Sequence, residues 1–401
     1  GLLDRDAWIK KGYDLPEFNM EEVTACTKEA PEWIHFGAGN IFKAFQTRMA
    51  QELLNKGILK KGIVVAEGFD YEIIEKMNRP HDNLSVVVTL KSDGTIDKAV
   101  VGSVVESLIL DSANKAEFDR LKEIFANPSL QMVSFTITEK GYSLTNAKGE
   151  IMPVVSEDFA AGPEAPNSYI GKVASLLYTR FKNGQLPIAM VSMDNCSHNG
   201  DKLFAAIDAF AKEWVKSGKA EPEFAEYIEN PAKVSFPWSM IDKITPRPDA
   251  GVEAILEKDS IEGLEPVITS KNTYVAPFTN AEETEYLVIE DSFPNGHPNL
   301  EEGGVIFTDR ETVDKVEKMK VTTCLNPLHT ALAVYGCLLG YDKISEEMKD
   351  EELVKLISTI GYKEGLPVVV NPGVLDPKQF IDTVIGVRLP NPFMPDIPQR
   401  I

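Results

Sequence analysis

A short apolar run that leads through a glycine turn into a helical repeat is the first clear pattern along the chain. Trp33-Ile34-His35-Phe36 is typical of a buried strand, and Gly37 to Asn40 follow as a turn. Apolar residues then recur at four-residue steps, at Ile41, Phe45, Met49 and Leu53. This spacing places them on one side of a helix that ends near Gly57. The pattern predicts a strand, a glycine turn and a helix.

Further apolar runs predict a sheet built largely from parallel strands. Residues 62–66 are expected to form a second buried strand, and residues 287–291 a later one. The runs at 84–90 and 99–110 are expected to form a hairpin around residues 91–94. The runs at 132–138 and 188–193 are separated by helical stretches, as parallel strands are.

The pattern changes after residue 219, where prolines become frequent. Residues 236–246 are expected to be an extended link between two domains. From residue 331 onward apolar residues recur at helical spacing, and further helices are expected at 346–359 and 377–385. We therefore predict an α/β fold, with a Rossmann-like dinucleotide-binding domain over residues 1–245 and a mainly α-helical domain over residues 246–401.

Composition narrows the class of protein. The chain has 401 residues, of which 43% are hydrophobic, enough for two cored domains. No apolar run is long enough to span a bilayer, and the start lacks the features of a signal peptide, so a cytoplasmic protein is expected. Four scattered cysteines do not form a disulfide framework. The net charge of −21 argues against a nucleic-acid partner.

The glycine turn suggests a place for a dinucleotide. Gly37 and Gly39 allow the backbone to approach a pyrophosphate, while Asn40, Ile41 and Phe42 begin the helix whose N–H groups would face it. The fingerprint is incomplete because Phe42 stands where a third glycine is usual. An ordinary strand-to-helix turn is the alternative.

Two acidic residues, Glu67 and Asp70, lie just past the strand over residues 62–66. A dinucleotide fold places an acid there against the adenosine ribose, and a carboxylate disfavours a 2′-phosphate. NAD is therefore expected rather than NADP. The distance from Gly39 is longer than usual, so the choice between the two acids stays open.

Polar clusters follow two later strands of the predicted sheet. Thr138 lies at the end of one, and Asp194 with Asn195 at the end of the other. Ligands bind at this edge of such sheets. Alternatively, Asp194 or Asn195 caps the helix expected over residues 203–215.

The stretch from residue 319 to residue 335 brings together an amine, a carboxamide and an imidazole, on Lys320, Asn326 and His329. Asn326-Pro327 predicts a helix start with Asn326 as the N-cap, which places His329 on the same side of the first turn. A carbonyl/alcohol interconversion needs donors toward the developing alkoxide and one group that moves the proton. Asn195 with Asn326 supply such donors, and a buried Lys320 the proton.

Two other classes of protein are alternatives to an enzyme that interconverts a carbonyl and an alcohol. Cys196, His198, Cys324 and His329 are candidates for a zinc site, although their spacing is a poor match to structural zinc motifs. A non-enzymatic sensor of sugar acids or nucleotides on the same fold is the other alternative.

Six segments, in order along nearly the whole chain, resemble the polyol-specific long-chain dehydrogenases, the mannitol dehydrogenase family. Besides the Lys/Asn/His cluster they are Phe36-Gly37-Ala38-Gly39-Asn40, Thr138-Glu139-Lys140-Gly141-Tyr142, Asp194-Asn195 with Asn199-Gly200, Met240-Ile241-Asp242-Lys243-Ile244-Thr245-Pro246, and Val288-Ile289-Glu290-Asp291. The resemblance implies a metal-independent enzyme in which Lys320 is the general acid/base, Asn195 and Asn326 form the oxyanion hole, and His329 orients the substrate. It also implies that Arg400 contacts the substrate.

Two departures from the family pattern concern the site. Five residues separate Lys320 from Asn326, where the family usually has four. On a continuous α-helix the extra residue would turn Lys320 by roughly 100°, so either a non-helical approach or a π-bulge is required. Family members also continue well past the position of Arg400, so we expect the site as given to be incomplete.

The matching motifs favour a uronate substrate within this family. They lean toward NADH-dependent reduction of fructuronate to D-mannonate, with mannitol 2-dehydrogenase and tagaturonate reductase as alternatives. Asp242, Lys243 and Arg400 are the expected substrate-binding residues, with Lys243 or Arg400 as the cation that a uronate carboxylate needs. The sequence does not predict an oligomeric state.

Overall fold

A six-stranded parallel sheet forms the centre of the molecule, in the order β6-β3-β2-β7-β8-β9. The computed structural model describes residues 2–247, 250–261, 263 and 265–400. The strands are β2 (Trp33–Phe36), β3 (Ile63–Glu67), β6 (Val104–Ile109), β7 (Met132–Phe135), β8 (Ile188–Ser192) and β9 (Val234–Ser235). Every residue of β2, β3, β7 and β8 is buried, as expected for a parallel sheet covered on both faces.

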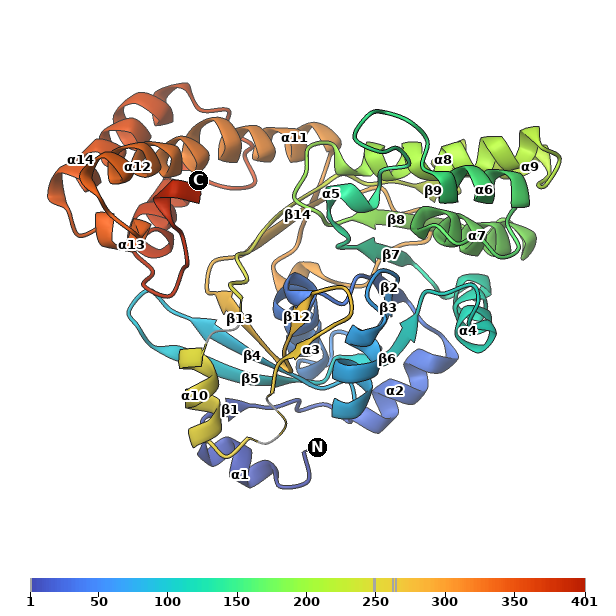
Figure 1. Cartoon of the computed structure of the whole chain (residues 1–401), viewed down its shortest axis with the longest axis horizontal. Coiled ribbons are helices and arrows are strands. Elements are labelled where there is room, and N and C mark those ends of the chain that lie inside the picture. The colour runs from blue at the N-terminus through green and yellow to red at the C-terminus, as the bar shows by residue number, and fades with distance from the viewer. Residues whose placement is uncertain (1, 248–249, 262, 264, 401) are drawn as a thin grey trace.

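Helices pack on both faces of this sheet (Figure 1). Ile34 and Phe36 point into one apolar cluster and Trp33 into the other, because successive strand residues face opposite sides. The first cluster is covered by α4 (Lys115–Ala126), α6 (Pro153–Ala161), α7 (Tyr169–Lys182), α8 (Asn199–Lys216) and α9 (Pro222–Glu229); the second by α2 (Met20–Glu29) and α3 (Thr47–Asn55). The predicted Rossmann-like α/β architecture is confirmed.

A second sheet, in the order β1-β5-β4-β13, contains the predicted hairpin. Its strands are β1 (Tyr13–Asp14), β4 (Ser85–Leu90), β5 (Ile96–Val101) and β13 (Phe278–Glu282). β4 and β5 pair antiparallel from Ser85↔Val101 to Leu90↔Ile96, so the hairpin is confirmed. The run predicted as one strand over 99–110 is two strands, because the chain leaves this sheet at Gly102 and enters the central sheet as β6.

The segment predicted as an extended link over residues 236–246 is instead part of a third sheet. Here β10 (Ser239–Asp242) pairs antiparallel with β14 (Tyr286–Glu290), which pairs in parallel with β15 (Ile306–Thr308). Between them lie α10 (Ala250–Lys258) and the two-stranded β11 (Val267–Ile268) and β12 (Tyr274–Val275). Residues after 245 therefore form the helix α10 and several strands before the run of C-terminal helices begins. The predicted boundary at 245/246 stays a prediction.

The C-terminal helices project to one side of the strands (Figure 1). They are α11 (Arg310–Met319), α12 (Asn326–Leu339), α13 (Ile344–Glu347), α14 (Glu351–Ser358) and α15 (Pro377–Thr383). Met319, Leu328, Leu332, Ile357 and Ile381 meet in their common core. The helical C-terminal part is confirmed. Across the described ranges, no helix is long and apolar enough to cross a membrane.

Candidate active site

Lys320 begins a π-helical turn that connects α11 to α12. This turn, η5 (Lys320–Cys324), closes with the Leu325 N–H donating to the Lys320 carbonyl at 3.1 Å, a span of five residues. A π turn holds one residue more than an α-helical turn. Of the two ways to absorb the extra residue between Lys320 and Asn326, the structure therefore has the π-bulge.

Three of the four predicted catalytic residues line one cavity of about 230 Å³. The lining residues are Asn195, Cys196, Ser197, Met240, Glu317, Lys320, Val321 and Asn326. They come from the turn after β8, from β10, and from the end of α11 through the start of α12. These residues are far apart in the sequence, but the fold brings them together around one cavity.

The Lys320 amine is buried and faces a carboxylate. Lys320 is 4% exposed, and its Nζ lies 3.3 Å from Oδ1 of Asp242 on β10. Burial lowers the pKa of Lys320, because a desolvated ammonium ion is disfavoured. The nearby Arg388 charge also lowers it, while Asp242 opposes the shift. Lys320 is thus suited to exchange a proton closer to neutral pH than a surface lysine.

Asp242 is held by an arginine that the sequence reasoning missed. Arg388 Nη1 donates to Asp242 Oδ2 at 2.5 Å and Nη2 to Oδ1 at 2.8 Å, and Nη2 also donates to Glu282 Oε1 at 2.9 Å. Burial acts to raise the pKa of Asp242, but the Arg388 hydrogen bonds and charge hold it below its ordinary value. Asp242 is therefore an anion beside Lys320, while its predicted contact with substrate stays a prediction.

Asn326 is the first residue of α12, not its cap. Leu325 occupies the N-cap position with φ −126° and ψ −65°, there is no side-chain cap hydrogen bond, and Pro327 follows inside the helix. The predicted N-cap role is wrong because the π turn leads directly into α12. The Asn326 carboxamide is consequently available to the cavity.

In the turn after β8, Asn195 lines the cavity, whereas the carboxylate of its neighbour Asp194 accepts hydrogen bonds from the residues that follow β7. The Asp194 carboxylate accepts from the backbone N–H of Ile137 at 3.0 Å and of Thr138 at 2.8 Å, and from the Tyr142 hydroxyl. Neither Asp194 nor Asn195 caps α8, which begins at Asn199 without a side-chain cap. The capping alternative is wrong, and Asp194 ties the ends of β7 and β8 together.

His329 lies one turn beyond Asn326 on α12 and is not among the residues that line the cavity. Its Nε2 lies 3.6 Å from Oδ2 of Asp396 and has no hydrogen-bond partner in the part of the chain that the structure describes. Its role in orienting a substrate stays a prediction.

The glycine turn packs closely against the residue that follows β7 and leads into a helix N-terminus. Gly37 has φ +105°, and a Cβ there would lie 2.3 Å from the Thr136 carbonyl oxygen. The helix begins at Asn40 and runs through a π-helical segment, η1 (Phe42–Gln46), into α3. Its first N–H groups have no partner within the helix. A phosphate would find these donors beyond the end of β2.

Phe42, in the place of the usual third glycine, stacks on a strand histidine. The rings of Phe42 and His35 lie 4.2 Å apart with an 8° angle between their planes. Burial lowers the pKa of His35 to about 3, so the ring is neutral and exchanges hydrogen bonds with Ser134 and Thr136. The aromatic stack takes the place of the close helix-to-strand contact that glycine allows.

Both predicted ribose-binding acids are bound by groups of the protein, Glu67 as the last residue of β3 and Asp70 three residues beyond it. Glu67 accepts from the Ala38 N–H at 2.8 Å and from the N–H groups of Phe69 and Asp70. Asp70 accepts from the Thr269 hydroxyl at 2.6 Å. Glu67 thus shapes the glycine turn, and the ribose contact of either acid stays a prediction. Thr138, which opens α5 (Thr138–Gly141), has a left-handed φ of +64° and stays a predicted cofactor residue.

The two predicted cations differ in their surroundings. Lys243 has a buried side chain and forms an ion pair with Glu285. Arg400 is exposed on η9 (Pro398–Arg400), which packs against α12, and within the described residues its guanidinium has no partner. Only Arg400 is free to receive an anion without breaking an ion pair.

The zinc alternative is not supported by the arrangement of its residues. Cys324 is buried among apolar side chains and its Sγ is 3.9 Å from the Pro377 carbonyl oxygen. Among described residues, the one group of three or more suitable side chains that come together is His198, Asp314 and Glu317. Of the four predicted ligands it includes only His198.

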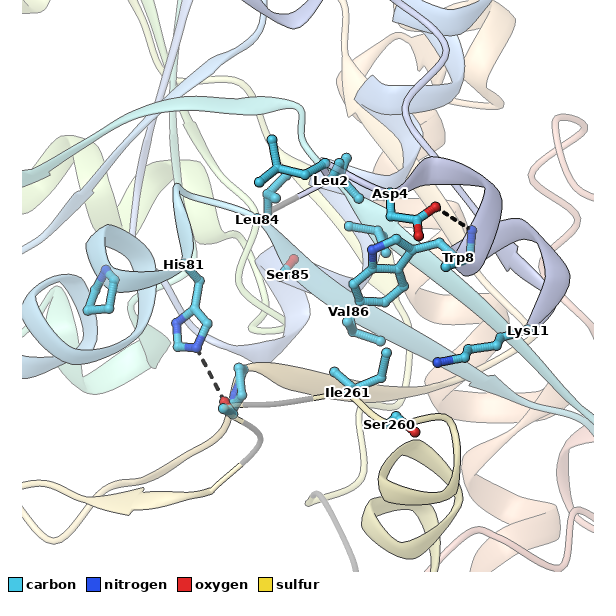
Figure 2. Close-up of a pocket in the computed structure, with 16 residues that line it drawn as sticks. Leu2, Asp4, Trp8, Lys11, His81, Leu84, Ser85, Val86, Ser260 and Ile261 are labelled. Carbon is cyan, nitrogen blue, oxygen red and sulfur yellow. Dashed lines mark hydrogen bonds between the residues drawn. The ribbon is translucent and has the colours of Figure 1, made fainter.

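A larger cavity of about 710 Å³ shares no lining residue with this site. Figure 2 shows it between α1 (Arg5–Lys10) and β4, with the Trp8 indole and the side chains of Leu84, Val86 and Ile261 around it. Most of the residues that line it are apolar, and none of Lys320, Asn195 and Asn326 is among them.

Comparison with known proteins gives the family. The mannitol dehydrogenase Rossmann domain matches residues 31–302, and the mannitol dehydrogenase C-terminal domain matches residues 312–401. The chain belongs to the mannitol dehydrogenase family. The family resemblance and the oxidoreductase class predicted from the sequence are confirmed.

Several known proteins are similar to most of the chain. D-mannonate oxidoreductase of Thermotoga maritima is 54% identical over 402 residues, which are 100% of this chain and 74% of the relative. The structure of D-sorbitol dehydrogenase has a TM-score of 0.80 at 25% identity, over 97% of this chain and 74% of that one. Mannitol 2-dehydrogenase of Pseudomonas fluorescens, solved with NAD and D-mannitol, has a TM-score of 0.74 at 26% identity, over 97% and 73%.

Proposed function

We propose that this protein interconverts D-fructuronate and D-mannonate with NAD as the hydride carrier. The observation that carries the proposal is the convergence of the Lys320 amine with Asn195 and Asn326 on one cavity. The similarity to a D-mannonate oxidoreductase over the whole chain supports the choice of substrate. A cytoplasmic location fits this role and stays a prediction.

Each residue of the cavity has a distinct task in the proposed reaction. NAD, when bound, accepts hydride from the alcohol or, as NADH, donates it to the ketone. The Asn195 and Asn326 amides donate hydrogen bonds to the substrate oxygen and stabilise the negative charge that develops there. Lys320 gives a proton to that oxygen during reduction and takes it back during oxidation. Asp242 holds the Lys320 Nζ in place.

The cofactor preference follows from the charges near the glycine turn. Gly37 allows the tight turn beside Thr136, and the carboxylates of Glu67, the last residue of β3, and of Asp70 lie at the same edge of the sheet. Negative charge there disfavours a 2′-phosphate. NAD is therefore proposed over NADP, and Gly37, Gly39, Asn40, Ile41 and Phe42 as the pyrophosphate-binding turn.

A uronate carries a carboxylate that must be paired on binding. Lys243 already forms an ion pair with Glu285, whereas Arg400 is exposed beside α12. α12 also carries Asn326 and His329. We assign Arg400 as the carboxylate anchor, because an arginine binds a carboxylate bidentately.

A substrate panel tests the proposal. Initial rates are measured with D-fructuronate, D-tagaturonate and D-fructose, each with NADH and with NADPH. We expect D-fructuronate with NADH to give the highest kcat/KM. Faster turnover of D-fructose, the ketone partner of mannitol, would assign a polyol dehydrogenase instead, and preference for D-tagaturonate would assign the epimeric uronate.

A further inference from the structure

A cluster of three metal-ligating side chains lies at the edge of the cavity and has no part in the proposed reaction. It contains His198, Asp314 and Glu317, and one ligand atom from each lies within 4.8 Å of the others. Glu317 lines the cavity, and His198 directly follows the lining residue Ser197. The cluster therefore joins the turn after β8 to α11.

His198 is held in a defined position. Its backbone adopts the left-handed conformation, with φ +50°, and its ring stacks on Trp238 at 4.1 Å with a 16° angle between the planes. The Trp238 indole is itself fixed, because its Nε1 donates to Asp201 Oδ1 at 2.9 Å. The imidazole thus needs little ordering to become a ligand.

The carboxylates of α11 present suitable oxygens on the same side. Asp314 Oδ2 forms an ion pair with Lys318 at 2.6 Å, which leaves Oδ1 facing His198 Nε2 at 3.4 Å. Two ligands of a tetrahedral zinc ion, each about 2.1 Å from the metal, are separated by about that distance. The Lys318 hydrogen bond holds the pKa of Asp314 below its ordinary value, so Asp314 is an anion.

Glu317 completes the set from three residues further along α11, on the same face. Within the described ranges its carboxylate forms no hydrogen bond or ion pair, so no interaction of that kind must be broken to bind an ion. Its ligand atom already lies within 4.8 Å of those of His198 and Asp314.

We propose that His198, Asp314 and Glu317 bind one divalent zinc ion, with water as the remaining ligand. One imidazole and two carboxylates suit a borderline cation of this kind. The ion would link the 31–302 and 312–401 parts of the chain beside Lys320. Binding of the ion does not depend on the proposed function, because none of the three side chains has a part in the proposed reaction.

Zinc binding is measured on the metal-free whole chain by isothermal titration calorimetry, without substrate or NAD. We expect one equivalent to bind, and His198→Asn and Asp314→Asn each to weaken binding at least ten-fold. Asparagine tolerates the left-handed backbone of residue 198, so His198→Asn keeps the local fold, which circular dichroism checks. His81→Ala, at a histidine outside the cluster, is the matched control and retains wild-type affinity.

The competing outcomes are distinct. Binding that survives His198→Asn but is lost in Cys196→Ser would place the ion on a thiolate and overturn the proposal. Absence of binding at micromolar zinc would also overturn it. Cobalt substitution gives an independent readout, because a site of nitrogen and oxygen ligands shows no thiolate charge-transfer band.

Discussion

The charge of Lys320 depends on a carboxylate that is itself held by Arg388. In Asp242→Asn the anion that opposes the lowering of the Lys320 pKa is lost. We therefore expect the limb of the reduction pH profile that requires protonated Lys320 to move to lower pH. We also expect kcat to fall by at least about ten-fold. Measuring kcat against pH for the wild type and the variant checks this. If the limb does not move, Asp242 does not influence the pKa of Lys320.

A single glycine controls the shape of the cofactor turn. In Gly37→Ala a Cβ would lie 2.3 Å from the Thr136 carbonyl oxygen at a φ of +105°. We expect a loss of about 1–3 kcal/mol in the free energy of unfolding and a raised KM for NADH. Chemical denaturation and NADH titration measure these effects.

Gly39→Ala is the matched stability control for this glycine. A Cβ at Gly39 meets nothing within 4 Å, and its φ is not positive. Its free energy of unfolding should therefore stay close to the wild-type value. Equal losses for the two variants would contradict the role given to Gly37.

Among the site residues, those with a local signal were predicted and those without one were not. Lys320, Asn195 and Asn326 each stand in a recognisable short motif. Arg388 and Glu282 have none, because Arg388 acts through its contact with Asp242, 146 residues away, and Glu282 through its contact with Arg388, 106 residues away. Burial of an ion pair cannot be seen in a linear pattern.

The π turn η5 is the element on which the direction of Lys320 depends. Deleting the exposed Thr322 should convert this turn to an α-helical one and rotate Lys320 by roughly 100° relative to Asn326. We expect kcat to fall by about 100-fold or more while circular dichroism still shows a folded protein. Thr322→Ala keeps the length and should retain turnover. An active deletion variant would show that the register is unimportant.

Local pattern predicted the elements that form within a short stretch, such as the β4–β5 hairpin and α12. It failed where pairing is distant: β10 is a strand because it pairs with β14, more than 40 residues later. It also could not choose between a π turn and a non-helical approach at Lys320, because both satisfy the same spacing. Asn326 was predicted to be the N-cap of α12 because the sequence does not show that the π turn leads directly into this helix.

Arg388, at the end of η8 (Val384–Arg388), connects the C-terminal helices to two sheets of the molecule. It binds Asp242 on β10 and Glu282 on β13. In Arg388→Met two buried carboxylates lose their cation, which costs about 3–5 kcal/mol when a buried pair is broken. Guanidinium denaturation should show this loss, whereas Arg310→Met, at a half-exposed surface ion pair, should lose less than about 1 kcal/mol. Similar losses of unfolding free energy in the two variants would contradict the claim that Arg388 stabilises the fold more than a surface arginine does.

The central claim is that this cavity performs the redox reaction and that Lys320 moves the proton. The most direct measurement is the rate of NADH oxidation with saturating D-fructuronate, for the wild type and for Lys320→Met, a neutral side chain of similar length. We predict turnover by the wild type and a fall of about 100- to 10,000-fold in Lys320→Met, with NADH binding retained. Wild-type turnover in Lys320→Met would contradict the account.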